Sequence, residues 1–548
     1  MSTTTTTTVS PPKTGAATVL SERVNWSRFS DYAVIFVFLS ALYPAILYNL
    51  DIYSPVPQRL LGLVFIAALV IYVYFFRAGW RTTVLATLFV AVSLFAYGYL
   101  REFSYDGLNY HGAVALMLDR GEPWSPGMRQ LGGIFWVEHY PKAFEFFAYT
   151  ARLLTGHFNS GKAFTLLLSV PALVCLMQLF RTTVQSPRTA FFAAAACIYN
   201  PVAFGQLTTL YVDSAHFYCW TIFSVNLLFA VRKMPYSAAQ LGAALVLLIG
   251  SKMTGLVFGG LSIIVIFAVA FIGGDKREFL RKYKGVIGQL AVWSFVAVVI
   301  VGYSPYVQNI LAGKHIFYPL LGAQKVDIIT GHASPQFLSL NPLHRLLLSY
   351  FSVPSNCSSC SMAQPTFVLS VQHLKDAFIA LHTADTRFAG FGPFFGAMLI
   401  VSIIPFFWKR KGAHVVAIYL LATVVIVLIH PQSWWARYVP MLYTVPFLLT
   451  AAFSTSSKQL YVIIALAFAN SFLSMASVAG YVWLKQSHYK EAVASVREKC
   501  GEQPVALTWS QMNWEFDLRD DHIPISIDTP PARPVCAINF DDLMVMKK

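Results

Sequence analysis

Apolar tracts, each long enough to cross a lipid bilayer, recur along most of the chain and limit the folds open to it. The first begins near Tyr32 and the last ends near residue 483. A helix that spans a bilayer needs about 20 such residues, and we count about 13 tracts of this kind. The sequence therefore predicts an all-α polytopic membrane protein with about 13 transmembrane helices.

The composition agrees with this class. Of the 548 residues, 56% are hydrophobic and 12% are charged, whereas soluble domains carry about 25% charged residues. The formal net charge of +15 would suit a nucleic-acid-binding protein, but the basic residues cluster in short loops between the apolar tracts. This clustering is typical of membrane proteins, whose cytoplasmic loops are rich in Lys and Arg. We therefore expect the lipid bilayer, and no nucleic acid, as a partner.

The charge of the short loops predicts the orientation of the helices. Arg77 and Arg81 lie between the helices predicted at 60–76 and 82–100, and residues 275–284 form the most basic loop. Such loops face the cytoplasm. We therefore expect a multi-pass protein of the plasma or inner membrane, with its active face on the extracytoplasmic side.

Three regions follow from this orientation. Residues 1–30 begin with a Thr-rich run and lack an apolar core, so we expect a disordered cytoplasmic tail. Residues 31–484 form the predicted transmembrane domain, whose large external loops cover roughly 101–142 and 304–387. Residues 485–548 are polar and long enough for only a small extracytoplasmic domain.

Residues 101–141 lie between two apolar tracts and yet are rich in ionisable groups. Among them are Asp106, His111, Asp119, Glu122, Glu138 and His139. A membrane protein gathers such groups where water or a bound substrate meets them. Asp106 comes directly after an apolar tract, where a helix leaves the bilayer, and we take it as the candidate catalytic residue.

Two short segments near this point predict surface helices in the first external loop. Apolar and polar residues alternate irregularly over 106–119, which is typical of an amphipathic helix on a membrane surface. Residues 143–156 are apolar, but they are few and are interrupted by Glu145 and Arg152. We therefore expect a surface or half-inserted helix there.

Polar residues from several separate connections are predicted to lie on the same external side as Asp106. As substrate-binding candidates we take His111, His139, Tyr211, Asp213, Lys252, His315, Arg387 and Arg437. One chamber at the external membrane surface explains their common side.

Each of these residues also has an ordinary structural interpretation. Asp106 and Asp213 are favoured helix N-caps, and Lys252 is suited to snorkelling at the membrane interface. Arg437 follows two tryptophans, as in an interfacial aromatic belt. The two histidines of residues 101–141 are suited to ordinary surface hydrogen bonds.

The cysteines separate into two groups. Cys175, Cys197 and Cys219 fall inside predicted helices, and the other four fall outside as the pairs Cys357/Cys360 and Cys500/Cys536. Zinc needs four clustered ligands, which a single CxxC does not supply. We expect no metal site at these cysteines, and we expect a disulfide within each pair on an oxidising face of the membrane.

The order of seven short motifs resembles the GT-C superfamily, the integral membrane glycosyltransferases that use polyprenyl-phosphate-linked sugars. The motifs are SYDGLNYH (104–111), EHYPKAFEF (138–146), LYVDSA (210–215), GSKMTGL (250–256), GKHIFYPL (313–320), RFAGFGP (387–393) and WWARYVP (434–440). The resemblance implies a GT-C-like fold with Asp106 as the catalytic base. Several members have an acidic pair at that point where this chain has one residue, so a divalent cation stays open as a cofactor.

The resemblance implies transfer of a hexosyl or pentosyl group to an extracytoplasmic glycan, lipid or protein of the cell envelope. An acceptor hydroxyl needs a base within about 3 Å, and the leaving phosphate needs a cation such as Lys252, Arg387 or Arg437. A single essential carboxylate favours inversion. The alternatives are a lipid-linked sugar transporter or flippase, in which an internal helix repeat is expected, and a polysaccharide polymerase or ligase.

Overall fold

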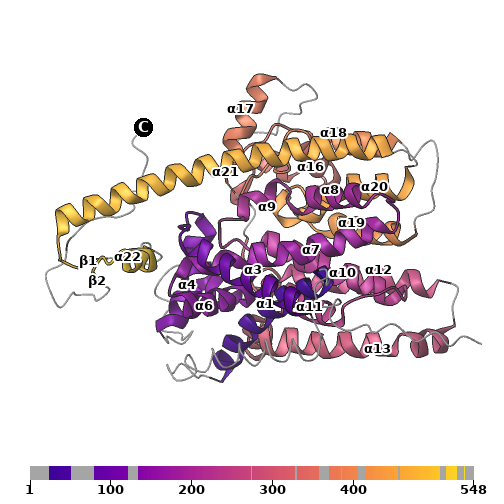
Figure 1. Cartoon of the computed structure of the whole chain (residues 1–548), viewed down its shortest axis with the longest axis horizontal. Coiled ribbons are helices and arrows are strands. Elements are labelled where there is room, and N and C mark those ends of the chain that lie inside the picture. The colour runs from indigo at the N-terminus through magenta and orange to yellow at the C-terminus, as the bar shows by residue number, and fades with distance from the viewer. Residues whose placement is uncertain are drawn as a thin grey trace, which may run out of the picture.

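The computed structural model describes residues 24–50, 79–120, 134–272, 275–327, 330–356, 370–383, 385–404, 414–454, 457–506, 514–526 and 536. Helices dominate these residues, and the long ones run side by side in one bundle (Figure 1). Seven are long and apolar enough to cross a membrane, and four further apolar helices are shorter. The predicted all-α polytopic class is confirmed for the described part of the chain, and the helix predicted at 60–76 lies outside that part.

The seven long helices are α1 (Trp26–Asn49), α3 (Trp80–Gly98), α7 (Ala163–Arg181), α10 (Asp213–Val231), α12 (Thr254–Phe271), α13 (Lys276–Phe295) and α21 (Ser457–Cys500). The shorter apolar helices are α8 (Pro187–Ile198), α11 (Ala238–Ser251), α19 (His414–Ile429) and α20 (Val445–Phe453). The connections contain α4 (Gly112–Arg120), α5 (Ile134–His139), α6 (Ala143–Thr155), α9 (Pro201–Gln206), α14 (Gln308–Leu311), α15 (Pro335–Leu338), α16 (Pro342–Tyr350), α17 (Val371–Ala380), α18 (Phe395–Ile403) and α22 (Glu515–Asp520). Two short parallel strands, β1 (Val505–Ala506) and β2 (Ile525–Ser526), follow α21 in the chain.

Polar side chains cap several helices where they begin. The Asn25 side chain accepts a hydrogen bond from the Arg28 N–H at 3.2 Å at the start of α1. Asp275 accepts from the N–H groups of Arg277 and Glu278, both at 3.0 Å, at the start of α13. These bonds satisfy N–H groups that the first helical turn leaves without a partner.

The centre of the bundle is α10, in which every residue is buried and which packs against α7 and α11. α6 also lies inside, because its Phe144 stacks on Phe164 and its Phe147 packs against Phe36 of α1. Residues 113–118 of α4 are buried as well. The segments expected as surface helices therefore pack inside the protein, because their apolar side chains face other helices of the chain.

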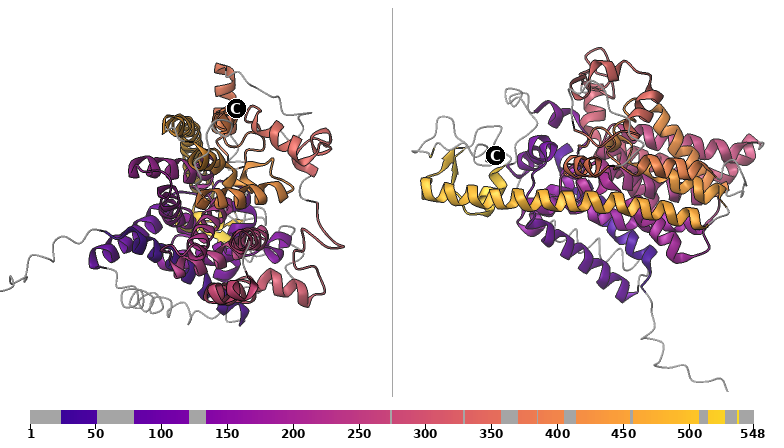
Figure 2. Two further views of the ribbon diagram at one scale, coloured as in Figure 1. Left: turned by 90° about the vertical axis from the view of Figure 1, so that its right-hand side faces the viewer. Right: turned by 90° about the horizontal axis from the view of Figure 1, so that it is seen from above.

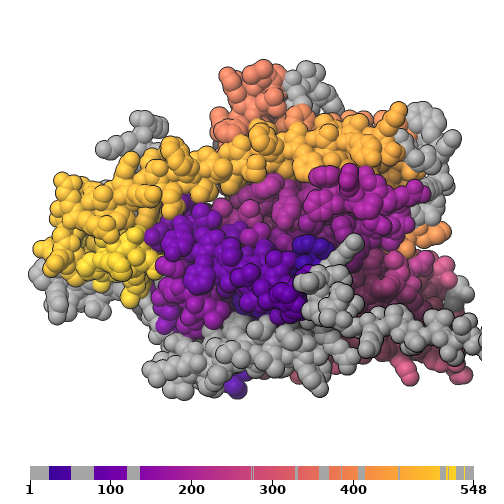
Figure 3. All heavy atoms as spheres, in the orientation of Figure 1, coloured from indigo at the N-terminus to yellow at the C-terminus, as the bar shows by residue number. Residues whose placement is uncertain are grey.

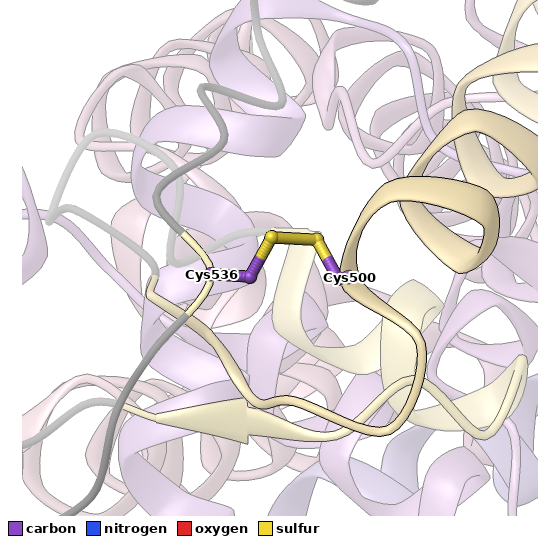
Figure 4. Close-up of a disulfide and its surroundings, with 2 residues drawn as sticks. All are labelled: Cys500 and Cys536. Carbon is purple, nitrogen blue, oxygen red and sulfur yellow. A yellow bond between two sulfur atoms is a disulfide. The ribbon is translucent and has the colours of Figure 1, made fainter.

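A small C-terminal unit follows α21, which runs without a break from Ser457 to Cys500 and carries the chain beyond the bundle (Figure 2). The unit contains β1, β2 and α22 and packs against the early part of the chain (Figure 3). The Cys500–Cys536 disulfide, one of the two predicted pairings, closes it, with the α-carbons 5.5 Å apart (Figure 4). Cys357 and Cys360 lie outside the described residues.

The two ends of the bundle differ in what they carry. α4 and α22 lie at one end, and the last residues of α12 and the first residues of α13 lie at the opposite end (Figure 1). The loop charges predict this relative placement, with the Asp106 segment and the C-terminal unit together and the basic loop at 275–284 away from them.

Candidate active site

The turn that carries Asp106 is built on a buried carboxylate. Glu102 is 0% exposed, and its two oxygens accept hydrogen bonds from the backbone N–H groups of Ser104 at 2.7 Å and Leu210 at 2.6 Å. Gly107 packs directly on Glu102, so that a Cβ atom there would lie 2.6 Å from the Glu102 carboxyl carbon. Glu102 therefore joins the Asp106 turn to the connection that leads into α10.

Asp106 stands at the start of a π-helical turn, Gly107–His111, that leads into α4. Its side chain makes no capping hydrogen bond, so Asp106 does not act as the helix N-cap that its position suggested. π-Helical turns inside α-helices occur frequently at functional sites.

Arg437 is the centre of the charged cluster. Its Nη2 donates to Asp106 Oδ2 at 2.9 Å, its Nη1 donates to Asp385 Oδ1 at 2.6 Å, and its Nε lies 3.6 Å from Asp213 Oδ2. Aromatic rings surround the guanidinium at 4.9 to 5.4 Å, and they belong to Tyr211, Trp435 and Tyr438. A planar, delocalised cation suits both contacts, because it can bond two carboxylates and pack against rings at once.

The protein environment keeps Arg437 charged. Burial alone would lower the pKa of Arg437, but Asp385, Asp106 and Asp213 together hold it well above the usual range. Burial raises the pKa of Asp385, and the Arg437 charge opposes that rise.

Lys252 and Asp213 extend this cluster into the membrane domain. Asp213 lies in the first turn of α10 and accepts hydrogen bonds from Lys252 Nζ and, at 2.7 Å, from Gln206 Nε2. Lys252 follows α11, and its Nζ lies 4.7 Å from the centre of the Tyr438 ring. The Lys252 side chain is 7% exposed, so it does not snorkel to the surface of the protein.

A large cavity with several charged side chains in its wall, which we call the chamber, opens beside Arg437. Its volume is about 1230 Å³. The predicted site residues in its wall are Asp106, Tyr211, Arg387 and Arg437. Arg387 donates to the backbone oxygen of Asn356 at 3.3 Å and forms no ion pair with any carboxylate of the described residues.

A second cavity, which we call the groove, adjoins the chamber and has a volume of about 550 Å³. Lys252, Lys325 and His430 are among its polar residues. Most of its wall is apolar, for example Met253, Val257, Phe258, Leu261, Phe317, Leu320, Ile426 and Ile429. Tyr140, Val326, Asp327 and Tyr438 line both cavities, which places the groove directly against the chamber.

Four predicted substrate-binding residues line neither cavity, and one of them is Asp213, which is buried and contacts Arg437 and Lys252. His111 is buried against the Glu145 carboxylate. The His139 ring packs edge-on against Tyr318 with the ring centres 4.8 Å apart. His315 is exposed, and its Nδ1 accepts from the Phe317 N–H at 3.1 Å.

Sequence reasoning missed two acidic residues that belong to the site. Asp385 bonds Arg437 and lies two residues before Arg387, just outside the RFAGFGP motif. Glu102 lies four residues before Asp106, just outside SYDGLNYH. Each could have been found in the sequence as the acidic residue that lies nearest to one of the seven motifs. Among the described residues, no group of three or more His, Cys, Asp or Glu side chains is arranged to hold a metal ion.

Comparisons with known proteins add little to this geometry. No protein-family model matches the chain, and no curated protein matches it by sequence. Among solved structures, the crystal structure of ArnT from Cupriavidus metallidurans in the apo state is similar over 81% of this chain and 86% of that chain, with 13% sequence identity and a TM-score of 0.37. Because this superposition is loose, we transfer no residue role from that protein.

Proposed function

We propose that this protein is a GT-C-like membrane glycosyltransferase, which moves a sugar from a polyprenyl-phosphate donor to an extracytoplasmic acceptor. The observation that carries the proposal is a chamber with charged side chains in its wall, Asp106 and Arg437 among them, placed against a mostly apolar groove. A donor of this class has the same two halves, because an apolar chain is joined through one phosphate to a polar sugar.

The shared wall of the two cavities suits the point where lipid and sugar meet. Tyr140 and Tyr438 line both cavities, and Lys252 lies on the groove side against the Tyr438 ring. An isoprenoid chain in the groove would bury apolar surface against Phe258, Leu261 and their neighbours, which favours binding. Its phosphate would then lie near Lys252 and Arg437, and its sugar would enter the chamber.

Asp106 is suited to act as the general base. Its Oδ2 is held by Arg437, whereas its Oδ1 has no hydrogen-bond partner among the described residues. An acceptor hydroxyl in the chamber would give its proton to that free oxygen while the hydroxyl oxygen bonds to the anomeric carbon of the sugar. The bond from that carbon to the phosphate oxygen breaks in the same step, so the products are an inverted glycoside and a polyprenyl phosphate. The cations would stabilise the charge that develops on the departing phosphate.

The disulfide supports an extracytoplasmic active face. Arg101, in the wall of the chamber, bonds Asp517 of the C-terminal unit at 2.7 Å, so the chamber and the unit lie at the same end of the bundle. The Cys500–Cys536 bond closes that unit. Disulfides form and persist in oxidising compartments outside the cytoplasm.

The test is the substitution Asp106→Asn, which keeps the shape of the side chain and removes the base. The expected loss is roughly 10²–10⁴-fold in the rate of sugar transfer. The assay measures transfer of a radiolabelled sugar from lipid-linked donors in membranes that contain equal amounts of each protein.

Asp119→Asn is the matched control. Asp119 belongs to the same segment and bonds Arg152 at 3.0 and 3.1 Å, but it lines neither cavity. We expect this variant to retain transfer. Near-full activity of Asp106→Asn would remove Asp106 as the base. No transfer by the wild type would favour a transporter of lipid-linked sugars.

A further inference from the structure

Among the described residues, the charged groups that contact Arg437 are all carboxylates. Three carboxylates, Asp106, Asp213 and Asp385, contact Arg437, and Lys252 is the second cation of this set. A donor phosphate adds another negative charge. Like charges at such short range repel strongly in a partly buried site, so binding of the phosphate is favoured if one carboxylate leaves Arg437.

Asp385 is the carboxylate that is best placed to leave. Its side chain is 26% exposed, compared with 13% for Asp106 and 2% for Asp213. Asp213 also accepts hydrogen bonds from Lys252 and Gln206. Among the described residues, the Asp385 carboxylate accepts a hydrogen bond from Arg437 alone. Asp385 lies in the connection between α17 and α18, outside the long helices.

A second guanidinium lies close to the same carboxylate. Arg387 follows Asp385 by two residues and lines the same chamber. Burial raises the pKa of Asp385, and the charges of Arg437 and Arg387 both oppose that rise. Both guanidiniums also lie near the Trp435 ring, at 5.4 and 5.9 Å from its centre. An anionic group in the field of two arginines is a typical arrangement for a bound phosphate.

We propose that the Asp385 carboxylate occupies the place of the donor phosphate between Arg437 and Arg387, and that the phosphate displaces it when the donor binds. This inference rests on the proposed function and assigns the phosphate to Nη1 of Arg437. Asp106 would remain on Nη2 of the same guanidinium. The base and the leaving group would then be positioned by one rigid, planar side chain.

The test measures the affinity of purified protein for farnesyl phosphate, a short polyprenyl phosphate without a sugar. Asp385→Asn removes the competing charge, so its dissociation constant should fall by roughly tenfold or more, which corresponds to one charge-assisted hydrogen bond. The KM for the lipid-linked donor should fall in parallel. Asp385→Glu keeps the charge and should retain an affinity near that of the wild type.

Asp376→Asn is the matched control, because Asp376 is a half-buried residue of the neighbouring helix α17 that accepts a hydrogen bond from Gln372 at 2.8 Å and lines neither cavity. This variant makes the same change in net charge and should leave the affinity unchanged. Thermal unfolding of each variant in the same detergent verifies that the protein is folded.

The outcomes separate the two proposals. If the wild type binds farnesyl phosphate and Asp385→Asn binds it no more tightly, this inference is overturned and the proposed function stands. This inference is also overturned if Asp376→Asn gains as much affinity as Asp385→Asn does, because the gain then comes from the change in net charge. If neither the wild type nor Asp385→Asn binds farnesyl phosphate, the proposed function fails and takes this inference with it.

Discussion

Replacing Arg101 by Met should detach the C-terminal unit from the Asp106 segment. Arg101 bonds Asp517 at 2.7 Å and Asp521 at 2.9 Å, and its guanidinium lies 5.1 Å from the centre of the Tyr489 ring. The side chains of Arg101 and Asp517 are 13% and 2% exposed. Methionine keeps most of the apolar stem, so the substitution chiefly removes the charge and its hydrogen bonds.

The magnitude follows from the burial of Asp517. Breaking a buried ion pair by removing one partner costs about 3–5 kcal/mol, because a buried charge is left uncompensated. We expect the lower end of that range, because Asn159 still donates to Asp517 at 2.6 Å. A cost of about 3 kcal/mol raises the population of the opened unit by roughly 10²-fold.

Native-state proteolysis measures this population, because cleavage of a transiently opened segment follows the fraction that is open. Arg101→Met should raise the rate of cleavage beyond residue 500 by roughly 10²-fold.

Burial raises the pKa of Asp517, and Arg101 opposes that rise. Without Arg101, the raised pKa means that the folded unit binds a proton more tightly than the unfolded chain does. The destabilisation should therefore be relieved as the pH falls through that pKa.

Lys499→Met is the control for this experiment. Lys499 is an exposed residue in the last turn of α21 and forms no ion pair with a carboxylate of the described residues. Exposed charges of this kind contribute about 0–1 kcal/mol, so the cleavage rate should change by less than about fivefold. If Arg101→Met accelerates cleavage no more than Lys499→Met does, the buried pair does not hold the unit in place.

Two further substitutions test how the Asp106 turn is built. Gly107→Ala places a Cβ atom 2.6 Å from the buried Glu102 carboxyl carbon, so the turn must shift. A shift of about 1 Å lowers kcat on the order of 10²-fold. In the control Gly285→Ala, the new Cβ atom meets nothing within 4 Å, and kcat should be unchanged. Glu145→Gln removes the charge that pairs with buried His111 and should lower the free energy of unfolding by about 1–3 kcal/mol. Differential scanning calorimetry measures this loss, and a Glu145→Gln melting temperature equal to that of the wild type would contradict a stabilising role for the pair.

The apolar tracts by themselves determined the class of this protein. A tract of about 20 apolar residues has few stable environments other than a bilayer, so its presence is informative without any knowledge of its neighbours. The cysteine pair at residues 500 and 536 was also readable, because both residues fall in the polar C-terminal region, away from the cysteines of the predicted helices. The charge of the short loops placed Asp106, Lys252 and Arg437 on one predicted side.

Only the tertiary structure decided which polar residues meet. Arg437 contacts Asp106, 331 positions away, and Asp385, 52 positions away, and no local pattern encodes such pairings. His111 and Asp106 lie in one short motif, yet His111 turns inward to Glu145 while Asp106 lines the chamber. The reason is physical: hydrophobicity and loop charge act on each segment separately, whereas an ion pair depends on the packing of several helices at once. The sequence therefore determined the side of the membrane on which the site was expected, and the fold determined its members.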